Sequence, residues 1–90
     1  MVPERASEIE NTVRAVLRDV LGLSAERVAA FDEETPLFGA LPELDSMAVV
    51  QLIGALEDHF GFGVDDDEIS AANFATLGSL AAFVRFKLTA

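Results

Sequence analysis

The chain has 90 residues, a length that fits one domain rather than two, so we expect residues 1–90 to form a single domain. Its 16 Asp and Glu residues outnumber its 6 Lys and Arg residues and give a formal net charge of -10, which argues against nucleic acids and anionic membrane surfaces as partners. The absence of cysteine excludes disulfides, thiolate nucleophiles and thiolate metal ligands.

Hydrophobic periodicity predicts a first helix from about Pro3 or Glu4 to Leu21, with Gly22 as its stop signal. The segment from there to Leu44 contains two prolines, a glycine and only short apolar runs, which is typical of a long ordered loop. A loop of this length in a small domain is usually either functional or disordered.

The second helix is the best specified in the sequence. It begins at Asp45 or Ser46, two residue types that cap helix N-termini, and it ends before Gly61. Its apolar side chains recur at helical spacing and predict one buried stripe, formed by Val49, Leu52, Ile53, Leu56 and Phe60.

A short helix is predicted after Gly61. Asp65 or Asp66 can cap it, and its turn covers Glu68 to Ala71. The acidic side chains at its start lie near the positive end of the helix dipole, where they are favourable. No run of alternating polar and apolar residues is long enough to indicate a strand.

The last helix is predicted to follow Thr76, which is a good N-cap residue. Phe83 and Phe86 lie outside its inner stripe, and we expect them to close the core against the first helix. The inner stripe consists of Leu77, Leu80, Ala81, Val84 and Leu88. Together the segments predict an all-α fold, a compact bundle of three long helices plus one short helix.

Ser46 lies at the predicted N-terminus of the second helix, within the run ELDSM at residues 43–47, and three interpretations of this serine are open. A helix cap is the simplest, because serine is a favoured N-cap residue. A catalytic nucleophile, as in a hydrolase, is the weakest. The only histidine, His59, lies thirteen residues along the same helix, about 20 Å away, and no Gly-x-Ser-x-Gly elbow occurs. The third is a modified serine, because an anionic group attached there would meet the unpaired amides at the positive end of the helix.

Four motifs follow one another between residues 7 and 88. They are Thr35-Pro36-Leu37-Phe38, Leu44-Asp45-Ser46-Met47, Leu56-Glu57-Asp58-His59-Phe60-Gly61 and Phe74-Ala75-Thr76-Leu77-Gly78-Ser79-Leu80. An Asp-Ser pair alone carries no information. In this order and at these separations, in a chain of this length and charge, the motifs resemble the acyl carrier protein family, including the carrier domains of polyketide and nonribosomal peptide synthesis.

The resemblance implies that Ser46 carries 4'-phosphopantetheine, transferred from coenzyme A by a separate phosphopantetheinyl transferase, and that Asp45 is the acid preceding it. The family motif is Asp-Ser-Leu. Met47 replaces the leucine here, an unbranched apolar exchange that keeps a contact for partner enzymes while changing its shape. The family's thiol-ended arm holds acyl groups as thioesters, so the protein is expected to be a substrate of other enzymes and not itself an enzyme. The implied function is a discrete acyl carrier protein that shuttles acyl groups between enzymes of fatty acid, polyketide or specialised lipid pathways.

The resemblance also implies that the core shelters the acyl chain between the second and third helices. Candidate residues for this acyl-chain pocket are Val49, Ile53, Leu56 and Ile69. Each of them is equally well explained as an ordinary core residue.

Eleven of the sixteen acidic residues lie between residues 32 and 68, a span without Lys or Arg. Such a face would steer acyl-loading and acyl-transferring enzymes that have basic surfaces, although it can also be a solvated surface that only keeps the protein soluble. The outward stripe of the second helix starts with Met47 and Val50 and stays neutral until Glu57 and Asp58. We therefore expect partner enzymes to use apolar contacts at Met47 and Val50 and charge at Glu57 and Asp58.

Two other functions remain open from the residues themselves. One is a peptidyl or aminoacyl carrier protein, which differs in its loading enzyme. The other is an unmodified acidic helical interaction module in which Ser46 only caps a helix.

The remaining expectations concern metals and location. Counted from Asp65, an EF-hand loop would need glycine at its sixth position and glutamate at its twelfth; the chain has Ser70 and Thr76, so no metal site is expected. The N-terminus lacks the apolar run of a signal peptide, and no uncharged stretch reaches the roughly 20 residues of a membrane-spanning helix. We expect a cytoplasmic monomer without membrane insertion.

Overall fold

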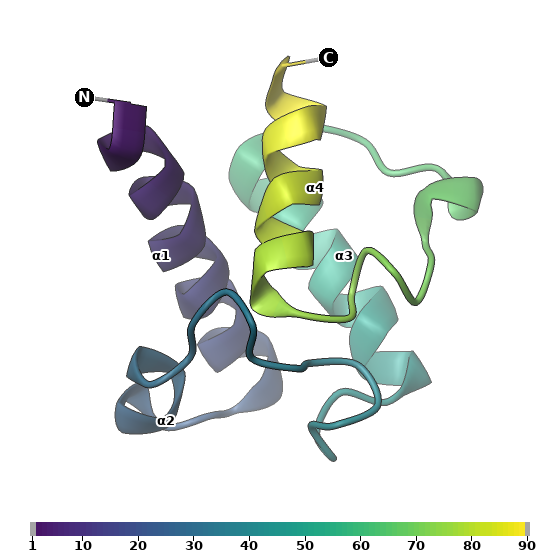
Figure 1. The fold of residues 1–90 in the computed structure, drawn as a ribbon. Coiled ribbons are helices and arrows are strands. Elements are labelled where there is room, and N and C mark those ends of the chain that lie inside the picture. The colour runs from purple at the N-terminus through teal and green to yellow at the C-terminus, as the bar shows by residue number, and fades with distance from the viewer. Residues whose placement is uncertain (1, 90) are drawn as a thin grey trace.

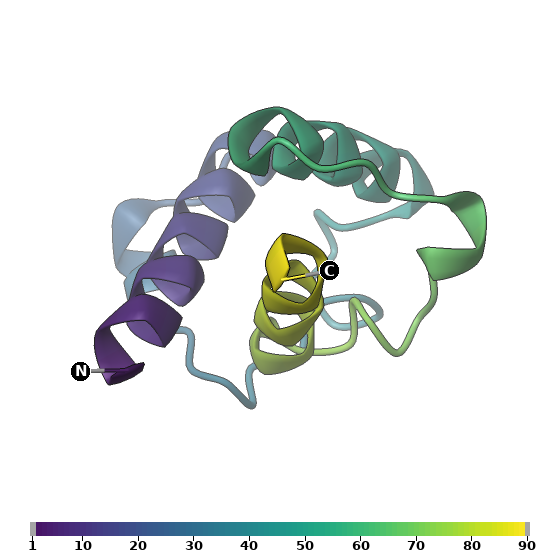
Figure 2. The ribbon, with the colours of Figure 1, turned by 90° about the horizontal axis from the view of Figure 1, so that it is seen from above.

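The computed structural model describes the backbone of residues 2–89 and the side chains of residues 8–89. Three long helices, α1 (Val2–Leu21), α3 (Ser46–Phe60) and α4 (Leu77–Thr89), surround a common interior (Figures 1 and 2). Two short elements complete the fold, the helix α2 (Ala25–Ala29) and the single 3-10 turn η1 (Asp66–Glu68). The predicted all-α class is confirmed, because the β-structure in residues 2–89 amounts to one isolated bridge between Pro36 and Thr76.

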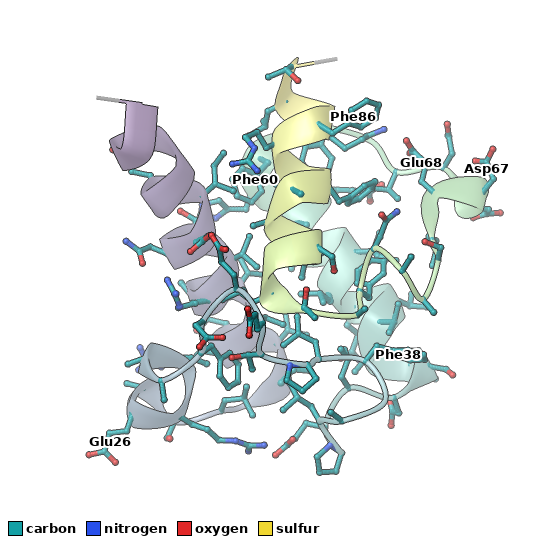
Figure 3. The ribbon with its side chains drawn as sticks, viewed as in Figure 1. Glu26, Phe38, Phe60, Asp67, Glu68 and Phe86 are labelled. Atoms are coloured by element: carbon teal, nitrogen blue, oxygen red, sulfur yellow. The ribbon has the colours of Figure 1, made fainter. Side chains whose placement is uncertain are left out.

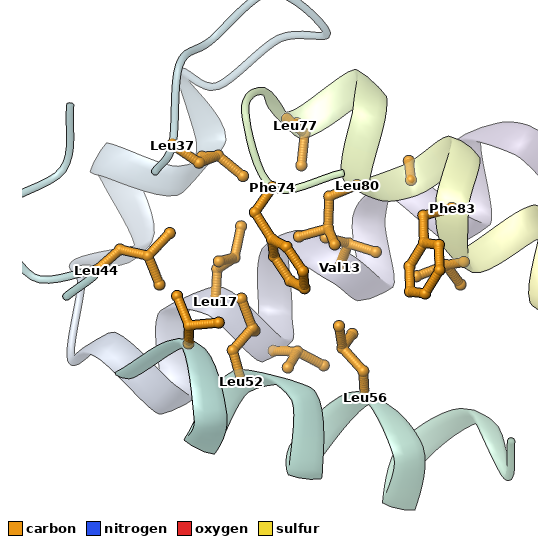
Figure 4. Close-up of a cluster of buried hydrophobic side chains, with 14 of the residues drawn as sticks. Val13, Leu17, Leu37, Leu44, Leu52, Leu56, Phe74, Leu77, Leu80 and Phe83 are labelled. Carbon is orange, nitrogen blue, oxygen red and sulfur yellow. The ribbon is translucent and has the colours of Figure 1, made fainter. Parts of the chain in front are cut away.

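The interior is filled by the apolar stripes of the three long helices and by the loops between them (Figure 4). No polar or charged side chain is buried among residues 8–89. Burial of each large aliphatic or aromatic side chain contributes about 1.5–3 kcal/mol, so these residues supply most of the free energy that favours folding. The largest fully buried members are Val13, Leu17, Leu37, Leu52, Leu56, Phe74, Leu77, Leu80 and Val84.

Helix α2 lies in the segment that the sequence predicts to be a loop. Its N-cap is Ser24, whose Oγ accepts a hydrogen bond from the Arg27 amide at 3.1 Å. Val28 is its one buried residue. Five residues with a single buried side chain show no hydrophobic periodicity, and for this reason the sequence pattern missed the helix.

The short helix predicted over Glu68 to Ala71 is instead the η1 turn, which lies two residues earlier along the chain. Asp65 precedes it, as predicted. The Glu68 carboxylate accepts a hydrogen bond from the Asp65 amide at 2.9 Å and closes the turn. Ile69 has an extended backbone (φ -85°, ψ 97°), so the helix cannot continue toward Ala71.

Helix α4 starts after Thr76 as predicted, because the Ser79 amide donates to Thr76 Oγ1 and the Thr76 amide donates to Ser79 Oγ, both at 3.0 Å. Its inner stripe is confirmed apart from Leu88, which is 44% exposed. Phe83 is buried against Phe74, with ring centroids 6.4 Å apart, but Phe86 is 61% exposed. The prediction for Phe86 is wrong because this residue lies one turn beyond Phe83, near the C-terminal end of the helix, and points outward (Figure 3).

The long loop before α3 is ordered by hydrogen bonds to a distant part of the chain. The amides of Leu37 and Phe38 donate to the carbonyl oxygens of residues 75 and 74, at 2.8 and 3.0 Å. In the opposite direction, the amides of residues 77 and 78 donate to the carbonyl oxygens of residues 35 and 33, at 3.0 and 2.9 Å. Arg14 adds two hydrogen bonds from α1 to the Phe31 carbonyl oxygen, at 2.9 and 3.2 Å. These contacts fix the direction from which the chain enters α3.

Within the part of the chain that the structure describes, every helix is too short or too polar to cross a lipid bilayer.

Candidate functional site

The N-terminus of α3 is capped by Asp45. Its backbone is extended (φ -93°, ψ -174°), and its Oδ1 accepts a hydrogen bond from the Ala48 amide at 2.8 Å. The Asp45 carbonyl oxygen accepts the first intrahelical bond, from Val49 at 2.9 Å. Ser46 therefore occupies the first helical position, and its interpretation as the helix cap is wrong.

The Ser46 side chain is exposed. No side chain among residues 8–89 hydrogen-bonds its hydroxyl, and the adjacent Asp45 carboxylate is already committed to the Ala48 amide. His59 lies near the opposite end of the same helix, exposed, with its ring 5.2 Å from that of Phe60. Ser46 is thus an accessible hydroxyl without a neighbouring histidine to activate it as a nucleophile.

A cavity of about 280 Å³ opens beside Ser46. Two of the predicted pocket residues, Val49 and Ile69, line it together with Ser46. The other two, Ile53 and Leu56, lie further along α3 in the packed core, with 7% and 1% exposure. Most of the remaining lining is apolar and comes from the loop before α3, from α3 and from the chain between η1 and α4. These residues are Phe38, Val50, Ala71 and Phe74.

Four of the exposed large apolar residues gather around Ser46 and this cavity. Met47 and Val50 on α3 are 70% and 64% exposed, and Phe38 and Ile69 are 41% and 39% exposed. Figure 3 shows Phe38 on the loop next to the start of α3. Sequence reasoning selected Met47 and Val50 but missed Phe38, whose position depends on the hydrogen bonds between its loop and residues 74–78.

The acidic residues near the site differ in what they do. Glu43, just before α3, receives two hydrogen bonds from Arg27 of α2, at 2.6 and 3.1 Å. These bonds hold the pKa of the Glu43 carboxyl below its usual value and raise the pKa of Arg27. Of the two acids predicted to meet partners, Asp58 is exposed, whereas Glu57 is half-buried and accepts a hydrogen bond from the Val64 amide at 2.8 Å.

Among the side chains that the structure describes, no group of three His, Asp or Glu residues is placed to hold a metal ion.

The comparisons with known proteins agree on one family. The family model for the phosphopantetheine attachment site matches residues 11–84. An acyl carrier protein of Nitratidesulfovibrio vulgaris is 40% identical over 63 residues, which cover 67% of this chain and 74% of the relative. Another, from Thermosynechococcus vestitus, is 33% identical over 87 residues, which cover 93% of this chain and 96% of the relative.

The fold is similar to the solution NMR structure of a holo acyl carrier protein from Nitrosomonas europaea, with a TM-score of 0.82 and 56% sequence identity over 91% of this chain and 96% of that chain. The match to the family model, the sequence identity to relatives over 74% and 96% of their length and the shared fold all point the same way. The chain therefore belongs to the acyl carrier protein family, whose prosthetic group is phosphopantetheine.

Proposed function

We propose that this protein is a discrete acyl carrier that holds acyl groups on 4'-phosphopantetheine attached at Ser46 and passes them between enzymes of a fatty acid, polyketide or specialised lipid pathway. The observation that supports the proposal best is the state of Ser46, an exposed hydroxyl at the first position of α3 that is left free because Asp45 caps the helix. When bound, the prosthetic group supplies a terminal thiol that carries acyl groups as thioesters.

The start of α3 suits an attached phosphodiester. The first amides of a helix have no intrahelical partner, and here the Ala48 amide is satisfied by Asp45. The amides of Ser46 and Met47 remain to face an anion on the Ser46 oxygen, at the positive end of a 15-residue helix. Asp45 thus satisfies one of the first amides of α3 and leaves those of Ser46 and Met47 available.

The surroundings of Ser46 suggest how partner enzymes bind. The exposed side chains of Met47 and Val50 offer apolar contact beside the attachment point. Asp45 and Asp58 are exposed acids on either side of this stripe, and they favour enzymes with basic surfaces, first among them a phosphopantetheinyl transferase. Because the stripe itself is neutral, apolar packing is expected to decide which enzyme stays bound.

We therefore treat the chain as a substrate and not a catalyst, since the Asp45 carboxylate beside Ser46 is bonded to the Ala48 amide and His59 lies near the opposite end of α3. We also propose that residues 1–90 form one domain and that the protein is a monomer in the cytoplasm, where coenzyme A and the transferase are available.

The test is an intact-mass measurement after incubation with coenzyme A and a broad-specificity phosphopantetheinyl transferase. The wild-type chain is expected to gain the mass of one phosphopantetheine, and Ser46→Ala to gain nothing. Ser70→Ala is the matched control, because Ser70 is also an exposed serine that lines the same cavity. No gain in the wild type would support the unmodified interaction module instead, and a gain that persists in Ser46→Ala would show that Ser46 is not the attachment residue.

A second step separates acyl carriers from peptidyl carriers. The protein that carries phosphopantetheine is incubated with acyl or aminoacyl donors and their respective loading enzymes. Mass gains that hydroxylamine removes report thioesters. Acyl loading without aminoacyl loading supports the acyl carrier, and the reverse result supports the peptidyl carrier.

A further inference from the structure

A short segment forms the outer wall of the cavity beside Ser46. Ile69, Ser70 and Ala71 line the cavity across from the α3 residues, and they belong to residues 65–72, which we call the wall segment. Figures 1 and 2 both show this part of the chain, with η1, standing out from the three long helices. The position of the wall segment relative to α3 therefore sets the size of the cavity, and with it the size of the group that fits.

The wall segment has little packing of its own. Each of its residues is exposed except Glu68, which is half-buried. The chain on either side is anchored, since the Val64 amide donates to Glu57 Oε2 at 2.8 Å and Phe74 is buried in the core. Between these two anchors, Asn73 bonds Glu68 and Ser70 from within the loop, and Glu68 is the residue of the segment that is also bonded to the side chain of a helix residue.

Glu68 makes bonds in three directions. Its carboxylate accepts two hydrogen bonds from Lys87 Nζ, at 2.8 and 3.1 Å, and one from the Asp65 amide at 2.9 Å. Its carbonyl oxygen accepts a hydrogen bond from Asn73 Nδ2 at 2.8 Å. Lys87 belongs to the last turn of α4. Within residues 8–89, no other side-chain hydrogen bond joins the wall segment to a helix. In Figure 3, Glu68 is directed toward α4, whereas Asp67 points outward.

The Lys87–Glu68 pair is also the more sheltered of two similar ion pairs. Its side chains are 15% and 24% exposed, compared with 41% and 32% for Arg27 and Glu43. Reduced contact with water strengthens a charge-assisted hydrogen bond and limits screening by salt. Arg27–Glu43 has nearly the same bond lengths but lies away from the wall segment, so it is a matched control.

We propose that the Lys87–Glu68 ion pair is a latch that fixes the wall segment to α4 and so limits the length of the apolar group that the cavity beside Ser46 admits. When the latch opens, residues 65–72 can move away from α3 while Val64 and Phe74 stay anchored. An acyl chain as the natural occupant rests on the proposed function. The latch itself is a property of the unmodified chain, and Lys87 acts in it as a positioning residue.

The test uses the full, unmodified chain as wild type, Lys87→Met, Lys87→Arg and Arg27→Met. Each protein is titrated with 1-hexanol and with 1-decanol, and the NMR signals of the Val49 and Ile69 methyl groups report binding in the cavity. In Lys87→Met, the affinity for decanol relative to hexanol is expected to rise about two- to fivefold, the range for a surface ion pair. Lys87→Arg, which keeps the charge, and Arg27→Met are expected to match the wild type.

Amide exchange gives a second readout that a general loss of stability would not mimic. The Ile69 amide, bonded to the Asp66 carbonyl oxygen at 3.1 Å, is expected to exchange faster in Lys87→Met, while the Val49 amide in α3 is unchanged. The latch is refuted if Lys87→Met keeps the wild-type alcohol preference and exchange rates, or if Arg27→Met changes them equally. Because no step uses Ser46, a failed latch leaves the carrier proposal standing, and a failed Ser46 modification leaves the latch standing.

Discussion

Replacing Gly78 by alanine tests how the loop that leads to Ser46 is held. Gly78 is the second residue of α4, and its amide donates to the Glu33 carbonyl oxygen at 2.9 Å. An added Cβ would lie 2.8 Å from that oxygen and 3.2 Å from Glu33 Cβ. Because the closest atom belongs to the backbone, no side-chain rotation relieves the clash. The loop must retreat, at a cost of about 1–3 kcal/mol.

Alanine in a helix also recovers about 0.5–1 kcal/mol relative to glycine, so Gly78→Ala is expected to lose about 1 kcal/mol of unfolding free energy at the middle of these ranges and at most about 2.5 kcal/mol. Gly54→Ala is the control, because Gly54 lies inside α3 and an added Cβ there meets nothing within 4 Å. It is expected to stabilise by about 0.5–1 kcal/mol. Urea unfolding followed by circular dichroism measures both variants. If Gly78→Ala is as stable as the wild type, or shifts in the same direction as Gly54→Ala, the close approach of the loop to α4 is not what holds it.

Three further predictions follow from the site. Asp45→Ala is expected to lose the helix cap and with it about 1 kcal/mol of unfolding free energy, whereas Asp45→Asn is expected to keep the cap and the stability. If the transferase rate falls in Asp45→Asn while the stability is unchanged, the lower rate is due to the lost charge. Val50→Glu is expected to change stability by less than about 0.5 kcal/mol but to raise the transferase KM about fivefold or more, and equal kinetics would argue against apolar docking. Hydrogen bonds from Arg27 and Lys87 lower the carboxyl pKa of Glu43 and Glu68, so these carboxylates stabilise the fold above their unfolded pKa near 4.5, and the contribution is lost as pH falls through the lower folded pKa. The difference in unfolding free energy between wild type and Arg27→Met or Lys87→Met should therefore shrink as the pH is lowered from 4.5, and a difference that stays constant with pH contradicts the assignment.

The long helices could be predicted from the sequence because each has enough residues for its apolar period to stand out. Asp45 and Gly61 mark the ends of α3 directly, as cap and as left-handed stop with φ 77°. The four motifs between residues 35 and 80 also located the candidate attachment residue, since their order and separations can be read from the sequence alone.

The parts that could not be predicted depend on contacts between distant segments. The hydrogen bonds between residues 33–38 and residues 74–78 place Phe38 beside Ser46. No periodic pattern in the sequence predicts these bonds. The same holds for the Lys87–Glu68 pair, whose members are 19 residues apart. Helix α2 is too short for periodicity, although Ser24 followed by Ala, Glu and Arg is a recognisable capped start. Glu57 stays predicted to meet partners, and the structure adds that its Oε2 accepts a hydrogen bond from the distant Val64 amide.

Peptide fragmentation can locate the modification and so decide whether Ser46 is the attachment residue. Cleavage after glutamate releases residues 44–57, in which Ser46 is the only hydroxyl-bearing residue, and residues 69–90, which contain Ser70 and Ser79. After incubation with coenzyme A and the transferase, we expect the phosphopantetheine mass on residues 44–57 alone. An unmodified 44–57 peptide, or the added mass on residues 69–90, would contradict it.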